Sequence, residues 1–176
     1  ILKDNEVRFD LGNYDSNNQL IIDPILVFAT YNGANSDNFG NSVSISGNNI
    51  VIGAYNDDDN GSNSGSAYVF TKPSGGWSTM TQTAKLTASD GAEYDNFGQS
   101  VSISGDNIVV GAYQDDDNGG DSGSAYVFTK ASGGWSNMTE TATLIASDGA
   151  TYDYFGHSVS ISGDNIVIGA RLDDDN

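Results

Sequence analysis

The chain has 176 residues, with 24 acidic side chains against 6 Lys and Arg, and a formal net charge of −18. Such a charge repels nucleic acid and anionic membranes, which are bound through Lys and Arg patches, and it attracts metal ions and basic partners. The absence of cysteine excludes disulfides and thiolate metal sites, and no apolar run is long enough for a transmembrane helix. Hydrophobic residues make up 37% of the chain and recur at regular spacing, which predicts a folded core rather than disorder.

Residues 1–24 do not follow the pattern of the rest of the chain. Residues 7–11 alternate apolar and polar side chains and predict a strand, and residues 20–22 predict a second strand that ends at Asp23-Pro24. We interpret this segment as a β lead at the junction to an upstream domain. Because the sequence starts without Met and stops inside a repeat, we expect it to be a piece of a longer protein.

A repeated unit organises the remainder of the chain. Phe39, Phe97 and Phe155 open successive copies, and the differences 97 − 39 and 155 − 97 both give a period of 58 residues. An internal period outranks other signals when a fold is predicted. The period divides residues 25–176 into the end of a preceding unit, two complete units and a partial one: 25–38, 39–96, 97–154 and 155–176.

Each complete unit contains four predicted strands and no helical period. In the second copy these strands are residues 100–104, 108–112, 124–128 and 140–146, separated by turns rich in Gly, Asn and Asp. A flat four-stranded unit cannot bury both of its faces alone, so such units must stack on each other. The sequence therefore predicts an all-β fold, a β-propeller of four-stranded antiparallel blades, present as an incomplete ring.

The alternation within these strands predicts which side chains are buried. Trp77 and Trp135 follow Gly-Gly turns and are interpreted as caps on the blade edges, with stacking on a sugar ring as the alternative. The Phe-Gly pairs that open each copy are assigned to packing between blades, since Gly permits close backbone approach. The predicted inward positions are Val43, Ile45, Ile50, Ile52, Val69, Val101, Ile103, Ile108, Val110 and Val127.

The repeated motifs resemble a known family. Phe97-Gly98, followed by Gly111-Ala112-Tyr113 and an Asp-rich loop, resembles the FG-GAP repeat of integrin-α-like β-propellers, and the order of motifs is similar to bacterial members. The Pro of "GAP" is replaced in all three copies, by Tyr55, Tyr113 and Arg171. Residues 21–33 are similar to the segment that enters propellers of the SBBP type, which implies an exported bacterial protein.

The resemblance also implies a function. It implies a non-catalytic binding or adhesion module, extracellular or on the cell surface, whose blade loops contact a protein or glycan ligand. Neither nucleic-acid binding nor membrane insertion is expected. The alternative is an accessory propeller of a larger secreted enzyme, with catalysis in another domain.

The acidic loops are candidate calcium sites, because calcium takes roughly six to eight oxygen ligands, often from alternate positions of a loop that turns on a Gly. The candidate ligands are Asn56, Asp58, Asn60 and Ser64 in the first loop, Gln114, Asp116, Asn118 and Ser122 in the second, and Asp174 and Asn176 in the third. The integrin-type loop usually has Asp where Ser64 and Ser122 stand, and Leu172 cannot be a ligand. We expect the first loop to bind most tightly and the third least, with solvated acidic turns as the alternative.

Two patterns that suggest catalysis are dismissed. Residues 120–123 spell GDSG, the nucleophile motif of trypsin-like proteases. The equivalent residues 62–65 read SNSG, so we interpret the match as sequence variation between copies of a loop. A catalytic triad also needs a base. The single histidine, His157, has Asn41 and Gln99 as its equivalents, which indicates a surface residue. No catalytic residue is predicted.

Overall fold

The computed structural model describes residues 2–3, 6–7 and 36–174, and every regular element in these ranges is a β-strand. The short strands β1 (Leu2–Lys3) and β2 (Glu6–Val7) pair with each other, and the predicted lead strands otherwise lie outside the described residues. The remaining strands are β3 (Val43–Ser46), β4 (Asn49–Ala54), β5 (Ser66–Thr71), β6 (Ala84–Leu86), β7 (Ser100–Ser104), β8 (Asn107–Ala112), β9 (Ser124–Thr129), β10 (Ala142–Leu144), β11 (Phe155–Ser162) and β12 (Asn165–Ala170).

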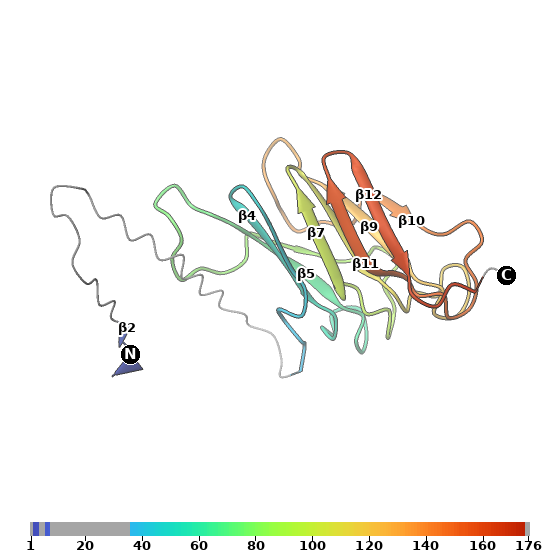
Figure 1. Cartoon of the computed structure of the whole chain (residues 1–176). Helices are drawn as coiled ribbons and strands as arrows, with labels where there is room; N and C mark the ends of the chain where they lie inside the picture. Colours follow the sequence, from blue (N-terminus) through green and yellow to red (C-terminus); the bar gives the residue numbers. More distant parts are fainter. Residues whose placement is uncertain (1, 4–5, 8–35, 175–176) are drawn as a thin grey trace.

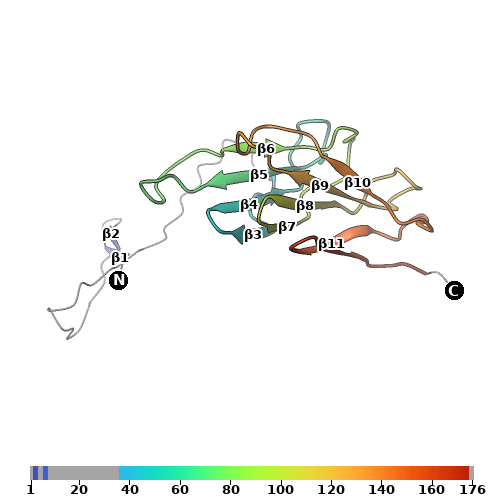
Figure 2. The ribbon, with the colours of Figure 1, turned by 90° about the horizontal axis from the view of Figure 1, so that it is seen from above.

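These strands form two complete blades and half of a third. One antiparallel sheet has the order β3-β4-β5-β6, the next has the order β7-β8-β9-β10, and β11 pairs with β12. The sheets stack face to face in chain order, and β7 contacts both β3 and β11 (Figures 1 and 2). The predicted fold, an incomplete β-propeller of four-stranded blades, is confirmed.

The first three predicted strands of a blade agree with the structure to within one residue, but the fourth is shorter than predicted. Residues 140–146 were expected to form it, whereas β10 contains only Ala142–Leu144. Before the strand, residues up to Glu140 contact the neighbouring blade, and the N–H of Thr141 is the first to donate to its own blade, to Val127 at 2.7 Å. Met138 forms a parallel bridge with Leu86 in β6, and its N–H donates to the carbonyl oxygen of Lys85 at 3.3 Å.

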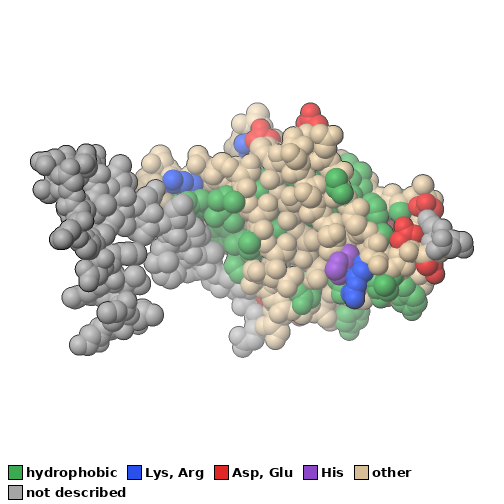
Figure 3. All heavy atoms as spheres, viewed as in Figure 1, with side chains coloured by type: hydrophobic (Ala, Val, Ile, Leu, Met, Phe, Trp, Pro, Cys, Tyr) green, Lys and Arg blue, Asp and Glu red, His purple; other side chains and the backbone are tan. Residues whose placement is uncertain are grey.

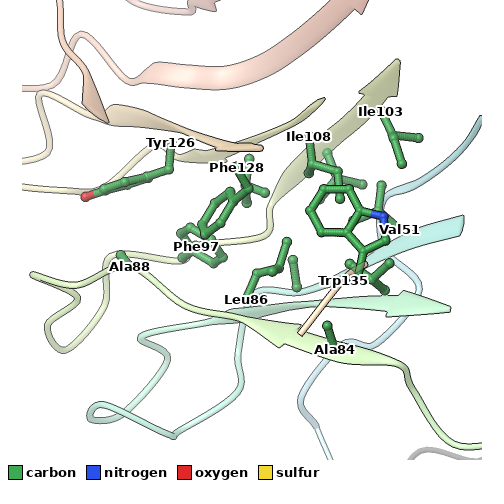
Figure 4. Close-up of a cluster of buried hydrophobic side chains, with 14 of the residues drawn as sticks. Val51, Ala84, Leu86, Ala88, Phe97, Ile103, Ile108, Tyr126, Phe128 and Trp135 are labelled. Atoms are coloured by element: carbon green, nitrogen blue, oxygen red, sulfur yellow. The ribbon is translucent and has the colours of Figure 1, made fainter. Parts of the chain in front are cut away.

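The main core lies between the first two blades (Figure 4). Alternate residues of each strand face opposite sides of the sheet, so each blade packs one set of side chains against each of its two neighbours. In this layer, small and medium side chains of β4 to β6 contact larger side chains of the second blade. The buried side chains of this layer are Val51, Ala67, Val69, Ala84, Leu86 and Ala88 from the first blade and its exit, and Phe97, Val101, Ile103, Ile108, Val110, Ala112, Tyr126, Phe128 and Trp135 from the second.

The Phe-Gly pair packs as predicted. The ring of Phe97 contacts Tyr126 and Phe128, with ring centroids 5.5 and 5.9 Å apart. Gly98 has φ +92° and approaches the backbone of the first blade so closely that a Cβ on Gly53 would lie 1.9 Å from its carbonyl oxygen. Two backbones therefore meet with no side chain between them. Trp135 is buried against the same layer, which confirms its interpretation as a cap.

Two of the predicted inward positions are wrong. Val43 and Ile45 are 63% and 62% exposed, whereas their equivalents Val101 and Ile103 are 7% and 5% exposed. The physical reason is that these side chains point to the side of the preceding blade, and no described strand covers that side of β3. Of the other predicted positions, Ile50 and Val127 are half-buried, and the rest are buried: Ile52, Val69, Ile108 and Val110.

Candidate functional site

The acidic loops and the connectors between blades lie at the same end of the sheets. Antiparallel pairing places the end of the second strand, the start of the third and the end of the fourth together, so residues 55–65 and 87–99 meet. The N–H groups of Tyr94 and Asn96 donate to the carbonyl oxygens of Ser62 and Asn63 at 2.8 and 3.1 Å. We call this end the loop face: residues 55–65, 87–99, 113–123, 145–157 and 171–174.

The ammonium group of Lys85, in β6, contacts the first acidic loop. Asp57 is buried and accepts a hydrogen bond from the hydroxyl of Tyr68. The Nζ of Lys85 lies 3.1 Å from Oδ2 of Asp57, forms an ion pair with Asp59, and stands 5.1 Å from the centroid of the Tyr68 ring. Lys85 reaches the loop because it lies directly opposite Tyr68 in the pairing of β5 with β6. One ammonium group thus pairs with two carboxylates and offsets one of their two negative charges.

The predicted calcium ligands of the first loop do not all face one point. Asp58 is exposed, and its Oδ1 accepts the N–H of Asn63 at 2.8 Å. Ser64 is buried, and its Oγ accepts the N–H of Asn60 at 3.0 Å and donates to the carbonyl of Asp57 at 3.2 Å. The serine therefore closes the loop internally. Asn56 is half-buried, and the side chain of Asn60 is exposed.

The second loop repeats this scaffold. Asp116 is exposed and accepts the N–H of Asp121 at 2.7 Å, while the buried Ser122 accepts the N–H of Asn118 at 3.2 Å. The Nε2 of Gln114 donates to Asp121 at 3.2 Å. In the third loop Asp174 is exposed, and Asn176 lies outside the described residues. Across residues 36–174, no three His, Asp or Glu side chains converge as a ready-made metal cage.

The second loop differs from the first in one respect, because Thr143 stands where Lys85 stands in the first copy. The hydroxyl of Tyr126 contacts Asp115 and lies 3.1 Å from Oδ1 of Asp90. Burial raises the pKa of Asp117, and the charges of Asp115 and Asp90 raise it further. This loop therefore gathers carboxylates without a lysine to neutralise them.

Asp95 joins the second loop to the connector before it. The carboxylate is buried, and its Oδ2 accepts the N–H of Ala92 at 2.6 Å, which caps the turn before it. Burial raises the pKa of Asp95 to about 7, the Ala92 hydrogen bond opposes the rise, and three other carboxylates add to it: Asp115, Asp116 and Asp90. Several carboxylates thus lie near one another around Asp95 on the loop face. Figure 3 shows further acidic side chains beside the C-terminal end of the described chain and others at the top of the view.

Comparison with known proteins identifies the repeats. The family model for the FG-GAP repeat matches residues 28–70, 80–128 and 138–176. The chain belongs to the FG-GAP repeat family. FG-GAP repeats build propellers that generally serve protein binding and adhesion, and they are typical of extracellular and cell-surface proteins. A comparison with curated proteins finds no match.

Between residues 36 and 174 this FG-GAP chain contains no helix of the length and hydrophobicity needed to cross a membrane.

Sequence reasoning missed the residues that hold the FG-GAP loops together, namely Asp57, Lys85 and Asp115. The spacing of calcium ligands selects alternate loop positions and therefore does not select Asp57 or Asp115. Both carboxylates are buried, and each contacts the hydroxyl of a tyrosine in the third strand. The available signal was the strand period. Tyr68 and Tyr126 occupy equivalent positions of the third strand, and Lys85 and Thr143 follow each of them at equal distance in the fourth.

Exchanging the residues opposite the two tyrosines should shift stability in opposite directions. We expect Lys85→Thr to lower the free energy of unfolding by about 1–3 kcal/mol, because it leaves the buried Asp57 charge without its ion pair. We expect Thr143→Lys to raise it by up to about 1 kcal/mol by adding a cation beside Asp115. Urea denaturation of both variants measures this, and equal shifts in the same direction would contradict the assignment.

The buried Asp95 should make stability fall with rising pH. Its pKa is about 7 in the folded chain against an ordinary value of 3.8, so the folded state holds the proton more tightly. The stability from this group is present below the unfolded pKa and is lost as pH rises toward 7. Asp95→Asn keeps an acceptor for Ala92 and should gain on the order of 1–2 kcal/mol at pH 8 relative to pH 4.

The measurement is the difference in unfolding free energy between Asp95→Asn and the wild type as a function of pH. Asp153→Asn is the matched control, since Asp153 accepts the N–H of Ala150 with the same geometry, at 2.6 Å. A difference for Asp95→Asn that stays constant from pH 4 to pH 8 would show that Asp95 is ionised throughout.

Proposed function

We propose that the chain is a non-catalytic binding and adhesion module of an exported protein of bacterial type, and that its loop face contacts the ligand. Membership in the FG-GAP family carries this proposal, because the repeats generally bind proteins. The loop face also carries exposed tyrosines in an uncommon backbone conformation. Tyr94 and Tyr152 occupy equivalent positions there, are each 56% exposed, and have φ +73°. Bulky side chains are uncommon at such a φ.

The charge of the loop face favours a protein ligand with a basic segment. Exposed carboxylates such as Asp58 and Asp116 stand on the same loops that pair with the tyrosine-bearing connectors. A Lys or Arg side chain gains from a nearby aromatic face and from carboxylates at once. A neutral glycan can stack on the aromatic rings and donate hydroxyl groups to the carboxylates, but it gains no charge attraction, and an anionic glycan is repelled.

The test is binding of the immobilised chain to poly-lysine and to an array of neutral glycans. We expect poly-lysine to bind, the binding to weaken as salt rises, and the double variant Tyr94→Ala, Tyr152→Ala to weaken it further. Exposed residues at the opposite end of the sheets, such as Ser74 and Ser132, supply alanine controls. Binding that these controls alter as much as the tyrosine variant would contradict the use of the loop face. Glycan binding without poly-lysine binding would reassign the ligand.

We also propose that calcium stabilises the acidic loops. The supporting observation is the chemistry of the donors, since each loop offers carboxylate, amide and backbone oxygens, which suit calcium. Ser64 and Ser122 are not part of this proposal, because their hydroxyls close the loops. Lys85 already offsets part of the negative charge of the first loop. We therefore expect the second loop to bind calcium more tightly, the reverse of the order that the residue types alone predict.

Millimolar calcium should raise the melting temperature, because a ligand that binds only the folded state adds about 2.7 kcal/mol at a hundredfold excess over Kd. Magnesium should do less, since it keeps its waters and prefers octahedral geometry. Asp116→Ala should reduce the gain and Lys85→Thr should increase it. Titration calorimetry without heat at millimolar calcium, together with a melting curve that chelator leaves unmoved, would identify the loops as solvated turns.

A further inference from the structure

A polar groove lies at the end of the sheets opposite the loop face. We call this end the hairpin end: residues 46–49, 71–83 and 129–135. The groove has a volume of about 510 Å³, and one of its walls comes from the first blade and the other from the second. Both blades have all four of their strands within the described residues. Because sites for small ligands have volumes of roughly 300–1,000 Å³, the groove is large enough for one sugar ring.

The first wall offers hydrogen-bond donors, because its acceptor oxygens are used within the blade. Oδ1 of Asn49 accepts the hydroxyl of Thr71 at 2.8 Å, and Oγ1 of Thr83 accepts the N–H of Thr71 at 2.9 Å. All three side chains line the groove. The amide Nδ2 of Asn49 and the hydroxyl hydrogen of Thr83 are then left to donate to a ligand.

The second wall supplies a positive charge. Among the described residues that line the groove, Lys130 is the only charged one. Its ammonium group forms an ion pair with Asp106, which holds the lysine in place and uses one of the three ammonium hydrogens. The acidic loops lie at the other end of the sheets, so a carboxylate is repelled less at this groove than at the loop face.

The indole of Trp135 adds a buried donor to the second wall. The side chain is 7% exposed, and no acceptor among the described residues reaches its Nε1. In Figure 4 this nitrogen lies on the side of the ring turned away from Phe97 and Tyr126, toward the hairpin end. Buried N–H groups are usually hydrogen-bonded, because an unmade bond leaves the cost of desolvation uncompensated.

The turn beside this indole leaves room for an acceptor to approach. Gly133 and Gly134 line the groove, and a Cβ added to either would meet no heavy atom within 4 Å. Nothing therefore packs closely against the turn, and a small shift of it brings the indole N–H of Trp135 within reach of a ligand in the groove.

We propose that this groove binds a carboxylate-bearing sugar, a uronic acid residue. The carboxylate pairs with the ammonium group of Lys130, which is the stronger kind of hydrogen bond because one partner on each side is charged. A lone carboxylate cannot also reach the donors of the first wall, so the ligand needs further oxygen acceptors around a ring. Trp135 contributes its N–H and not a stacking surface, because the ring itself is buried. The site does not depend on the role proposed for the loop face.

The probe is D-glucuronate, compared with D-glucose, which lacks the carboxylate, and with N-acetylglycine, which lacks the sugar ring. The titrated protein is Trp77→Phe, because Trp135 is then the remaining tryptophan and its fluorescence reports on the groove. We expect a saturable change with a Kd on the order of 1 mM, as for other ligands of this size. Glucose and N-acetylglycine should each bind about 10-fold more weakly or less. Calorimetry on the wild-type chain should give the same order of affinity.

Two matched pairs of variants locate the site. Lys130→Met should weaken glucuronate binding about 10-fold or more, whereas Lys72→Met, at the equivalent lysine of the first blade, should leave it unchanged. Trp135→Phe keeps an apolar ring without the N–H and should weaken binding roughly 2- to 10-fold by calorimetry, with Trp77→Phe as its control. Lys130→Met should leave poly-lysine binding unchanged, so this site and the loop face are tested separately.

Three results would overturn the proposal. The first is a wild-type chain that shows no saturable binding of glucuronate. The second is binding of glucose or N-acetylglycine as tight as that of glucuronate, which would mean that the carboxylate and the ring are not read together. The third is an equal effect of Lys130→Met and Lys72→Met, which would place the ligand outside the groove. Lys130 is partly exposed, so its replacement leaves the fold intact and this comparison is decisive even if Trp135→Phe does not fold.

Discussion

Gly53→Ala is expected to destabilise the folded chain by about 3 kcal/mol or more, the range for substitutions that force backbone to move. The added Cβ would lie 1.9 Å from the carbonyl oxygen of Gly98 and 2.9 Å from its carbonyl carbon. Both contacts are with backbone of the next blade, which cannot turn aside as a flexible side chain can. Gly111→Ala should behave alike, since its Cβ would lie 1.9 Å from the carbonyl oxygen of Gly156.

The matched control is Gly75→Ala. A Cβ on Gly75 meets no heavy atom within 4 Å, and its φ is not positive, so we expect a change within about 0.5 kcal/mol. Urea denaturation of the three variants measures the difference. If Gly53→Ala unfolds at the same denaturant concentration as Gly75→Ala, the blades are not in backbone contact at this point.

The contact between Gly53 and Gly98 shows which features the sequence predicts and which only the structure shows. The period of 58 residues predicts that Gly53, Gly98, Gly111 and Gly156 are equivalent in pairs. It does not predict that the glycine of one motif contacts the glycine of another motif in the next blade. That contact follows from the stacking of blades, and it explains why neither position carries a side chain in any copy.

Most of the fold was predictable because its elements depend on local patterns. Strict alternation in residues 100–104 and the turn at Gly105 are set by side-chain period and backbone φ, and both agree with β7 and the turn after it. The length of the fourth strand was not predictable in the same way, because the residues that precede it contact another blade, as Met138 does with Leu86. A contact with another blade cannot be predicted from the local sequence pattern.

The candidate site was predictable only in its position. Repeated Asp and Asn residues located the acidic loops, and the structure places them together on one face. The roles of individual residues required cross-strand register. Ser64 was predicted as a ligand but closes its loop, and Lys85, distant in sequence, reaches Asp57 through its pairing with Tyr68.

Val101→Asp is expected to cost several kcal/mol, about 3–5 by analogy with other unpaired buried charges, whereas Val43→Asp should change stability by about 0.5 kcal/mol or less. Both valines stand in the same local sequence, Ser-Val-Ser-Ile-Ser, and in the same strand of successive blades. Only their neighbours differ. Val101 lies in the core between the first two blades, and Val43 is 63% exposed.

The comparison isolates the contribution of the neighbouring blade, since strand propensity, hydrogen-bond register and side-chain volume are the same at the two positions. Both variants should be unfolded in urea and their midpoints compared with that of the wild type. Equal losses of stability would mean that the exposed side of β3 is covered in solution. A loss at Val101 alone would establish that a blade of this family draws its stability from the blade before it, because an isolated sheet cannot bury its own inner strand.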